Sequence, residues 1–220
     1  FKGGYITRHY AAPANQVLPI RGLTHGLELV WRLAVREGGS VEAPSAEPYD
    51  RLAAIYPAKG APSVVVIRAL GSPEAVAEMA ARVTPALLVV DEGLIEFSDS
   101  VSAATVIADR SNLVVLRSLS LAHGLAGARV GAAIAQAEAL GRLASVLEPY
   151  ALPEPLVRLA MQALDPSRMI ETAERIASVR RERERVAREL GRQMIVETGV
   201  GPIIMVRSED PAAALAALKA

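Results

Sequence analysis

Four short apolar runs constrain the fold of this chain more than any other feature of its sequence. Each run is continuous, rich in β-branched residues and bounded by residues that break regular structure, which is the pattern of a buried strand. The four runs cover residues 63–69, 86–91, 112–118 and 129–135, and a weaker fifth covers 17–21. We therefore expect a sheet whose central strands lie inside the protein.

Helical patterns fill the intervals between these runs. The segment 23–36 has its apolar residues at helical spacing. The segment 73–83 begins with Ser72 as N-cap and Pro73 as the first helical residue, an arrangement that is favoured at helix starts. A third helical stretch covers 100–108. Strands that alternate with helices in this way predict an α/β domain with a mostly parallel sheet.

The pattern changes in the last third of the chain. Three prolines in 148–155 indicate a linker or a helix break, and a long helix is expected over 166–190 with Gly191 as its stop. The other expected elements are two strands, at 193–197 and 202–207, and a last helix that begins at Asp210 and Pro211. We therefore divide the chain into a large α/β domain, 1–150, and a linker helix with a partial small domain, 151–220.

Composition argues against several classes of protein. The 24 Lys and Arg residues balance 24 Asp and Glu residues, so a net-basic nucleic-acid binder is not expected. The chain has no cysteine, and its three histidines lie far apart in sequence, which argues against disulfides and metal sites. No apolar run reaches the roughly 20 residues that a membrane span needs. We expect a cytoplasmic protein without a nucleic-acid, metal or membrane partner.

The segment 112–131 carries the most chemical information. Its strand ends in two hydroxyl residues, Ser118 and Ser120, then a glycine-rich stretch follows, and Arg129 lies nine residues after Ser120. Hydroxyls and a guanidinium gathered beyond the carboxyl end of a parallel strand suit a phosphate group. The same residues also fit a strand, a small-residue loop and a second strand without any ligand. Both interpretations stay open on these residues alone.

Two stretches carry recognisable motifs. Residues 117–131 read R-S-L-S-L-A-H-G-L-A-G-A-R-V-G, and residues 88–97 read L-V-V-D-E-G-L-I-E-F. Both resemble fold-type-I pyridoxal-phosphate-dependent aminotransferases, most closely histidinol-phosphate aminotransferase, with the threonine-phosphate decarboxylases behind it; a weaker match covers 17–29. The resemblance implies a three-layer α/β large domain of the PLP-transferase type with a mostly parallel sheet. It also implies a partial small α/β C-terminal lobe, pyridoxal 5'-phosphate as cofactor, and a dimer.

Five residues fall on cofactor-binding positions of the family. Asp91 matches the aspartate that pairs with the pyridinium nitrogen, although an aspartate at this place also fits a loop cap. Ser120 and Arg129 match phosphate ligands, and Ser118 matches the neighbouring hydroxyl. Thr24 lies in the segment that resembles the family's phosphate turn.

The sequence departs from the family pattern at positions that, in the family, contact the ring of the cofactor or bind it covalently. Leu121 occupies the position of the lysine that binds the cofactor covalently, and leucine has no amine. Leu94 replaces a tyrosine that contacts the ring oxygen, and Ala46 replaces the aromatic residue that stacks on the ring. Ser72 stands roughly where the family has an asparagine motif. We therefore expect no covalent aldimine and assign no catalytic residue.

Two functions stay open at this point. One is a catalytically degenerate relative that keeps the fold and part of the phosphate-binding cup, binds a phosphorylated small molecule, and pairs as a homodimer or with a related subunit. The alternative is an active PLP-dependent aminotransferase that acts on an amino acid or an amino-acid phosphate, if Leu121 is an artefact or an engineered change of the lysine. The family's arginine for the substrate carboxylate is expected beyond Ala220.

Overall fold

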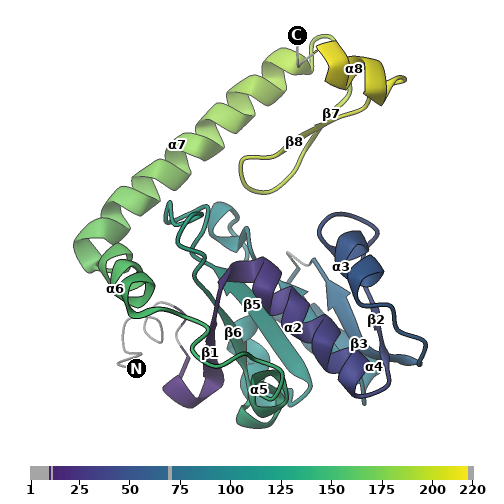
Figure 1. The fold of residues 1–220 in the computed structure, drawn as a ribbon. Helices are drawn as coiled ribbons and strands as arrows, with labels where there is room; N and C mark the ends of the chain where they lie inside the picture. Colours follow the sequence, from purple (N-terminus) through teal and green to yellow (C-terminus); the bar gives the residue numbers. More distant parts are fainter. Residues whose placement is uncertain (1–9, 11, 69–70, 218–220) are drawn as a thin grey trace.

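The computed structural model describes residues 10, 12–68 and 71–217, and it contains one large sheet, a small hairpin and helices around them (Figure 1). The elements in chain order are η1 (Ala14–Gln16), β1 (Val17–Ile20), α2 (Gly22–Arg36), β2 (Ser40–Glu42), α3 (Tyr49–Ile55), β3 (Pro62–Ile67), α4 (Pro73–Val83), β4 (Leu87–Asp91), η2 (Ile95–Phe97), η3 (Ala103–Asp109), β5 (Leu113–Ser118), β6 (Gly131–Ala135), α5 (Ala137–Ala144), α6 (Glu154–Ala163), α7 (Pro166–Leu190), β7 (Val196–Thr198), β8 (Ile204–Val206) and α8 (Pro211–Ala217).

The large sheet has six strands in the order β1-β6-β5-β4-β3-β2. Strands β2, β3, β4 and β5 are parallel, whereas β6 is antiparallel to both β5 and β1. The change of direction has a local cause, because β5 and β6 are joined by a loop and not by the helical crossover that a parallel pair requires. The expected mostly parallel sheet is confirmed, and the predicted run 129–135 forms its antiparallel strand.

Alternate residues of the central strands face two separate cores. Val64 and Val66 of β3 pack on one face with helices α2, α3 and α5. Leu88 and Val90 of β4 pack on the other face with α4, η3 and α6. This alternation gives three layers, helix, sheet and helix, and confirms the expected three-layer α/β class.

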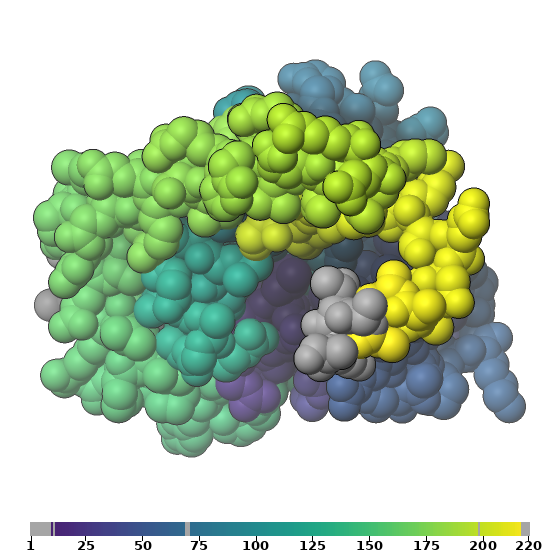
Figure 2. All heavy atoms as spheres, turned by 90° about the horizontal axis from the view of Figure 1, so that it is seen from above, coloured from purple at the N-terminus to yellow at the C-terminus, as the bar shows by residue number. Residues whose placement is uncertain are grey.

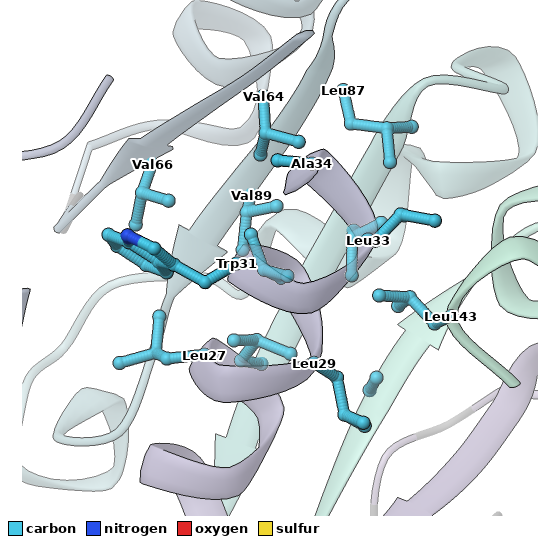
Figure 3. Packing of buried hydrophobic residues seen from close by; sticks show 14 of the residues in the cluster. Leu27, Leu29, Trp31, Leu33, Ala34, Val64, Val66, Leu87, Val89 and Leu143 are labelled. Carbon is cyan, nitrogen blue, oxygen red and sulfur yellow. The ribbon is translucent and has the colours of Figure 1, made fainter. Parts of the chain in front are cut away.

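Helix α2 forms the centre of the first core (Figure 3). Its residues Leu27, Val30, Trp31 and Ala34 recur at helical spacing, and each is at most 3% exposed. They pack against the valines and leucines of β3 and β4. Burial of each large side chain stabilises the fold by about 1.5–3 kcal/mol. The same packing fixes the first turn of α2 at the edge of the sheet where β4 and β5 end.

Two predicted boundaries are confirmed and two are wrong. Helix α4 begins after Ser72, whose Oγ accepts a hydrogen bond from the Ala75 N–H, and α7 covers 166–190 as expected. The predicted break at 148–155 lies between α5 and α6 but ends earlier than expected, because α6 begins at Glu154 with Pro155 in its first turn, where proline is tolerated. The predicted helix 100–108 is a 3₁₀ helix that begins later, at Ala103.

The C-terminal part is attached through α7 (Figure 1). Asp165 caps this helix, with its Oδ1 3.0 Å from the Ser167 N–H. The Arg183 guanidinium donates to the carbonyl oxygens of Gly199 and Gly201 in the loop between β7 and β8. The two predicted strands are confirmed as a short antiparallel hairpin. The division of the chain at residue 150 into two domains stays a prediction.

Candidate functional site

Strand ends gather at one edge of the large sheet. The register pairs Ser118 with Gly131 and Gly131 with Ile20, so the ends of β5 and β1 lie next to the beginning of β6. Asp91 ends β4 and pairs with Leu116 in β5. This edge is the place where open α/β sheets bind ligands. It brings together the end of β4, the end of β5, and the first turn of α2.

Arg129 covers the first turn of α2. Its backbone has a positive φ of 50°, and Gly22, the first residue of α2, has a φ of +73°. A methyl group added to Gly22 would lie 3.1 Å from Nη2 of Arg129, so the guanidinium rests directly on this glycine. Within the part of the chain that the structure describes, the guanidinium has no hydrogen bond and no ion pair. A positive charge and the unpaired N–H groups of a helix start therefore point to the same place.

Two serines complete this cluster from the side of β5. Ser118 is buried, and its Oγ accepts a hydrogen bond from the Ser120 N–H at 3.1 Å. The Ser120 Oγ is buried and has no hydrogen-bond partner among the described residues. An orphaned buried hydroxyl is unusual in a folded protein and suggests a missing partner. We call Ser118, Ser120, Arg129 and the first turn of α2, including the exposed Thr24, the phosphate cup.

The start of α2 is held by side chains outside the cup. The Arg21 N–H donates to Nδ1 of His25 at 3.0 Å, and Nε2 of the same ring lies 3.2 Å from Oε2 of Glu148. The Arg21 guanidinium also pairs with Glu148. Burial lowers the pKa of His25, which keeps Nδ1 available as an acceptor. This arrangement fixes the direction of the helix start without using the N–H groups of its first turn.

Asp91 lies beside the cup and is already paired. Its side chain is 4% exposed. Oδ2 accepts a hydrogen bond from Oη of Tyr49 at 2.5 Å and lies 3.9 Å from Nε of Arg68, and Oδ1 accepts from the Gly93 N–H at 3.0 Å. Burial, and then the negative charge of Asp91, raise the pKa of Tyr49 well above its ordinary value. Neither Tyr49 nor Arg68 was predicted from the sequence as part of the site.

A second buried charge cluster supports the strand ends. Glu92 follows Asp91, and its carboxylate accepts hydrogen bonds from the Ser102 hydroxyl at 2.5 Å and from the Ala103 N–H at 2.7 Å. Arg117 donates to Oε1 of Glu96 at 2.8 Å and lies 3.6 Å from Glu92. Burial raises the pKa of Glu92. These contacts join the end of β4 to β5, so we assign them a structural role.

The positions that depart from the family pattern offer no reactive group. Leu121 is 50% exposed, and Leu94 packs against the β7–β8 loop, where a methyl group on Gly201 would lie 3.1 Å from it. Ala46 is partly buried against the first core. Lys59, the one lysine among the described residues, is exposed in the loop before β3 and therefore lies at the opposite edge of the sheet. Lys2 and Lys219 lie outside the described residues.

His123 also belongs to the loop after β5, but its low pKa makes it a poor base. It is 6% exposed, and burial, with the positive charges of Arg175 and Arg117, lowers its pKa from 6.5 to about 4. Arg175 of α7 donates to the carbonyl oxygen of Ala122 at 3.2 Å, so this part of the loop is packed against α7. The contacts agree with the role of a packed loop residue.

Figure 2 shows the molecule from above, with the C-terminal part nearest the viewer. The surface of α2 is visible between the loop that follows β5 and the C-terminal hairpin and α8. Helix α7 runs along one side of this opening, and Arg180 joins it to the large domain through two hydrogen bonds to Asp99, at 2.9 and 2.7 Å.

Comparison with known proteins decides the family. The family model described as "Aminotransferase class I and II" matches residues 70–220. The chain belongs to this aminotransferase family. The matched range includes Asp91, both serines of the cup and Arg129.

Sequence relatives of this chain include proteins named histidinol-phosphate aminotransferase. The chain is 43% identical over 139 residues to "Histidinol-phosphate aminotransferase" of Stenotrophomonas maltophilia (strain R551-3), a match that covers 61% of this chain and 38% of the relative. It is 44% identical over 142 residues to the protein of the same name from Xylella fastidiosa (strain 9a5c), with the same coverage of both chains. The chain thus spans well under half the length of these relatives.

Solved structures confirm the fold of an aminotransferase. Histidinol-phosphate aminotransferase from Sinorhizobium meliloti, in complex with pyridoxal-5'-phosphate, superposes with a TM-score of 0.82 at 18% identity, over 96% of this chain and 66% of that chain. L-threonine-O-3-phosphate decarboxylase from Porphyromonas gingivalis gives a TM-score of 0.77 at 18% identity, over 99% of this chain and 77% of that chain. The expected likeness to histidinol-phosphate aminotransferase and the expected likeness to threonine-phosphate decarboxylase are therefore both confirmed in the fold.

The residues present fit one end of pyridoxal phosphate and not the other. The phosphate end fits, because among the described residues the Ser120 Oγ has no hydrogen-bond partner and the Arg129 guanidinium, which rests on the start of α2, has no ion pair. The ring end does not fit, because Asp91 is paired with Tyr49 and Arg68, and Leu121 offers no amine. The described residues contain no helix able to span a membrane, and no cluster of three or more His, Asp or Glu side chains that could hold a metal.

Proposed function

We propose that this aminotransferase-family chain is catalytically degenerate and binds a phosphorylated small molecule in the phosphate cup without a covalent bond. The observation that supports this most is the pair of unsatisfied groups in the cup, the Ser120 Oγ and the Arg129 guanidinium. Both are built into the fold at a helix start, where backbone N–H groups favour an anion. A phosphate monoester satisfies all three kinds of donor at once.

Each part of the cup has a distinct role in this proposal. Arg129 provides charge-assisted hydrogen bonds to the phosphate oxygens. Ser120 donates its hydroxyl hydrogen, and Ser118 orients Ser120 through the hydrogen bond between its Oγ and the Ser120 N–H. Thr24 adds a hydroxyl from the exposed side of the first turn of α2. The helix start contributes about 0.3–1 kcal/mol in favour of a negative charge.

The absence of an amine at position 121 supports the loss of catalysis. Transamination needs a group that holds the cofactor and that moves a proton during the reaction. The Leu121 side chain does neither, and no described lysine lies at this edge of the sheet. Loss of a catalytic group of this kind costs orders of magnitude in rate.

A second candidate is an active aminotransferase, which requires a lysine at position 121 in the natural protein. The relatives named histidinol-phosphate aminotransferase, at 43–44% identity, favour it. The absorption spectrum of the purified protein separates the two. Visible absorption typical of a covalently held cofactor, together with turnover of an amino acid or amino-acid phosphate, supports the active enzyme, and its absence after incubation with pyridoxal phosphate supports the degenerate relative.

The assembly belongs to the same proposal. We propose a dimer, either of two copies or with a related subunit, in the cytoplasm. Large apolar side chains are exposed on the C-terminal part, among them Ile195, Met205 and Leu215, each more than half exposed. An exposed apolar surface of this kind favours association. Light scattering over a range of protein concentrations tests it, and a monomer at every concentration contradicts it.

Titration calorimetry with inorganic phosphate tests the phosphate cup. We expect wild type to bind phosphate and Arg129→Ala to bind it at least tenfold more weakly, about 1.4 kcal/mol, because a charge-assisted contact is lost. Arg82→Ala is the matched control, since Arg82 is an exposed arginine on α4, on the other face of the sheet. Equal binding by wild type and Arg129→Ala contradicts the proposal, as does a wild type that binds no phosphate.

A further inference from the structure

Asp91 is a buried carboxylate that needs a positive charge near it. Its side chain is 4% exposed, and a carboxylate buried to this extent is costly unless it is paired. In the family that the chain resembles, the counterpart of Asp91 pairs with the positively charged ring nitrogen of the cofactor. A chain that does not hold that ring needs another source of positive charge at the same carboxylate.

The sheet register brings a cation to this place. Ile67 at the end of β3 pairs with Val90 in β4. Arg68, the residue after β3, therefore lies next to Asp91, the last residue of β4. Nε of Arg68 lies 3.9 Å from Oδ2 of Asp91, which is a charge contact and not a hydrogen bond. The Arg68 guanidinium carbon lies 5.4 Å from the centre of the Tyr49 ring, within the range of a cation–π contact.

Tyr49 fixes the geometry of this group. It is 1% exposed, and its ring is stacked on Trp31 of α2 with 6.4 Å between the ring centres. Its hydroxyl donates to the same Oδ2 of Asp91 at 2.5 Å, while the Gly93 N–H donates to Oδ1. Both carboxylate oxygens therefore have a donor from the chain, and the charge of Asp91 is balanced by Arg68.

We infer that Arg68, held over Tyr49, replaces a positively charged ring as the counterion of Asp91, so that the site takes phosphate monoesters without selecting for a protonated ring nitrogen. The inference rests on the proposed function, because it concerns the organic part of the ligand whose phosphate the cup holds. Arg68 is then a specificity-determining residue. Its charge removes the advantage that a cationic ring would otherwise gain beside Asp91.

Two ligands that differ at the ring nitrogen test this specificity. Benzyl phosphate and pyridoxine 5'-phosphate both carry a phosphate monoester next to an aromatic ring, and neither has an aldehyde. We expect the ratio of their dissociation constants in wild type to lie within about threefold. In Arg68→Gln the ratio is expected to shift about tenfold toward pyridoxine phosphate, because Asp91 then lacks its counterion.

Three further variants make this comparison specific. Arg68→Lys keeps the charge and is expected to keep the wild-type ratio. Arg51→Gln removes a charge from the exposed side of α3, the helix that carries Tyr49, and is expected to leave the ratio unchanged. Tyr49→Phe keeps the ring under Arg68 and the charge of Arg68 at Oδ2, and it is expected to keep the wild-type ratio. A wild type that prefers pyridoxine phosphate by tenfold or more, or an Arg68→Gln variant with an unchanged ratio, overturns the inference.

A second measurement does not depend on any ligand. A double-mutant cycle of Arg68→Gln and Asp91→Asn, followed by chemical unfolding, measures the coupling between the two side chains. We expect Arg68→Gln to destabilise wild type more than it destabilises Asp91→Asn. Additive effects contradict the pairing and overturn the inference even where phosphate binds. If neither ester nor inorganic phosphate binds, the proposed function fails, and the cycle still decides whether Arg68 is the counterion of Asp91.

Discussion

Replacement of Tyr49 by phenylalanine removes one hydroxyl from the centre of the candidate site. The Tyr49 hydroxyl donates to Asp91 at 2.5 Å, and the ring is 1% exposed, so the change leaves the packing volume almost intact. A hydrogen bond to a charged group contributes about 1.5–3 kcal/mol, and its loss leaves a buried carboxylate oxygen with only the Arg68 contact. We expect Tyr49→Phe to lower the free energy of unfolding by about 2 kcal/mol.

Thermal and urea unfolding measure this loss. For a chain of this length, about 2 kcal/mol corresponds to a decrease in Tm of roughly 4–8 °C. Tyr56→Phe is the matched control, because the Tyr56 hydroxyl also donates to a carboxylate, Glu28, at 2.7 Å, but in a partly exposed group. We expect the control to lose less than about 1 kcal/mol. Equal losses in both variants, or no loss in Tyr49→Phe, refute the view that Tyr49 stabilises a buried charge.

Three other predictions concern different parts of the fold. Gly131→Ala is expected to lower the free energy of unfolding, measured with urea, by about 1–3 kcal/mol, because its methyl group would lie 2.5 Å from the Arg117 carbonyl oxygen. Gly127→Ala is the control and is expected to lower it little, because Gly127 has open space around it. Burial and two arginines lower the pKa of His123 to about 4, so the unfolded state binds its proton more tightly. Wild type should therefore lose up to about 3 kcal/mol of stability between pH 7 and pH 4 that His123→Gln does not lose, and parallel pH profiles contradict this. Asp165→Ala is expected to lower stability by about 1 kcal/mol through loss of the α7 cap, and unchanged unfolding contradicts it.

The sequence predicts the central sheet well because its signals are local. The β-branched runs mark β3, β4 and β5, and their carboxyl ends place Asp91 and Ser118 at one edge without further information. The boundaries of α7 follow from the cap at Asp165 and from Gly191, which are local signals too. Where the elements are short, these signals weaken. Strand β2 has only three residues, Ser40–Glu42, and the sequence analysis does not identify it.

The partners of Asp91 could not be predicted in the same way. Tyr49 lies 42 residues before Asp91, and their contact depends on how α3 packs over the sheet. The position of Arg68 gives partial information about its role, because Arg68 directly follows β3, and the neighbouring strand β4 ends in Asp91. An arginine at that position predicts a counterion only once β3 and β4 are known to be adjacent. The missing information is therefore the strand order, which no local pattern contains.

The two ends of the site depend on the fold to different degrees. The phosphate cup uses the start of α2, the end of β5 and the tight contact of Arg129 with Gly22, so its donors are placed by the packing of the sheet itself. The ring contacts that the family resemblance implies are single side chains, and under the proposed function Leu121 and Leu94 replace two of them without changing the fold. We therefore expect a chain of this family to lose covalent cofactor chemistry more readily than phosphate affinity. The carboxylate of Asp91 is the exception under this proposal, because it would stay buried without a ring partner and would then need the charge of Arg68.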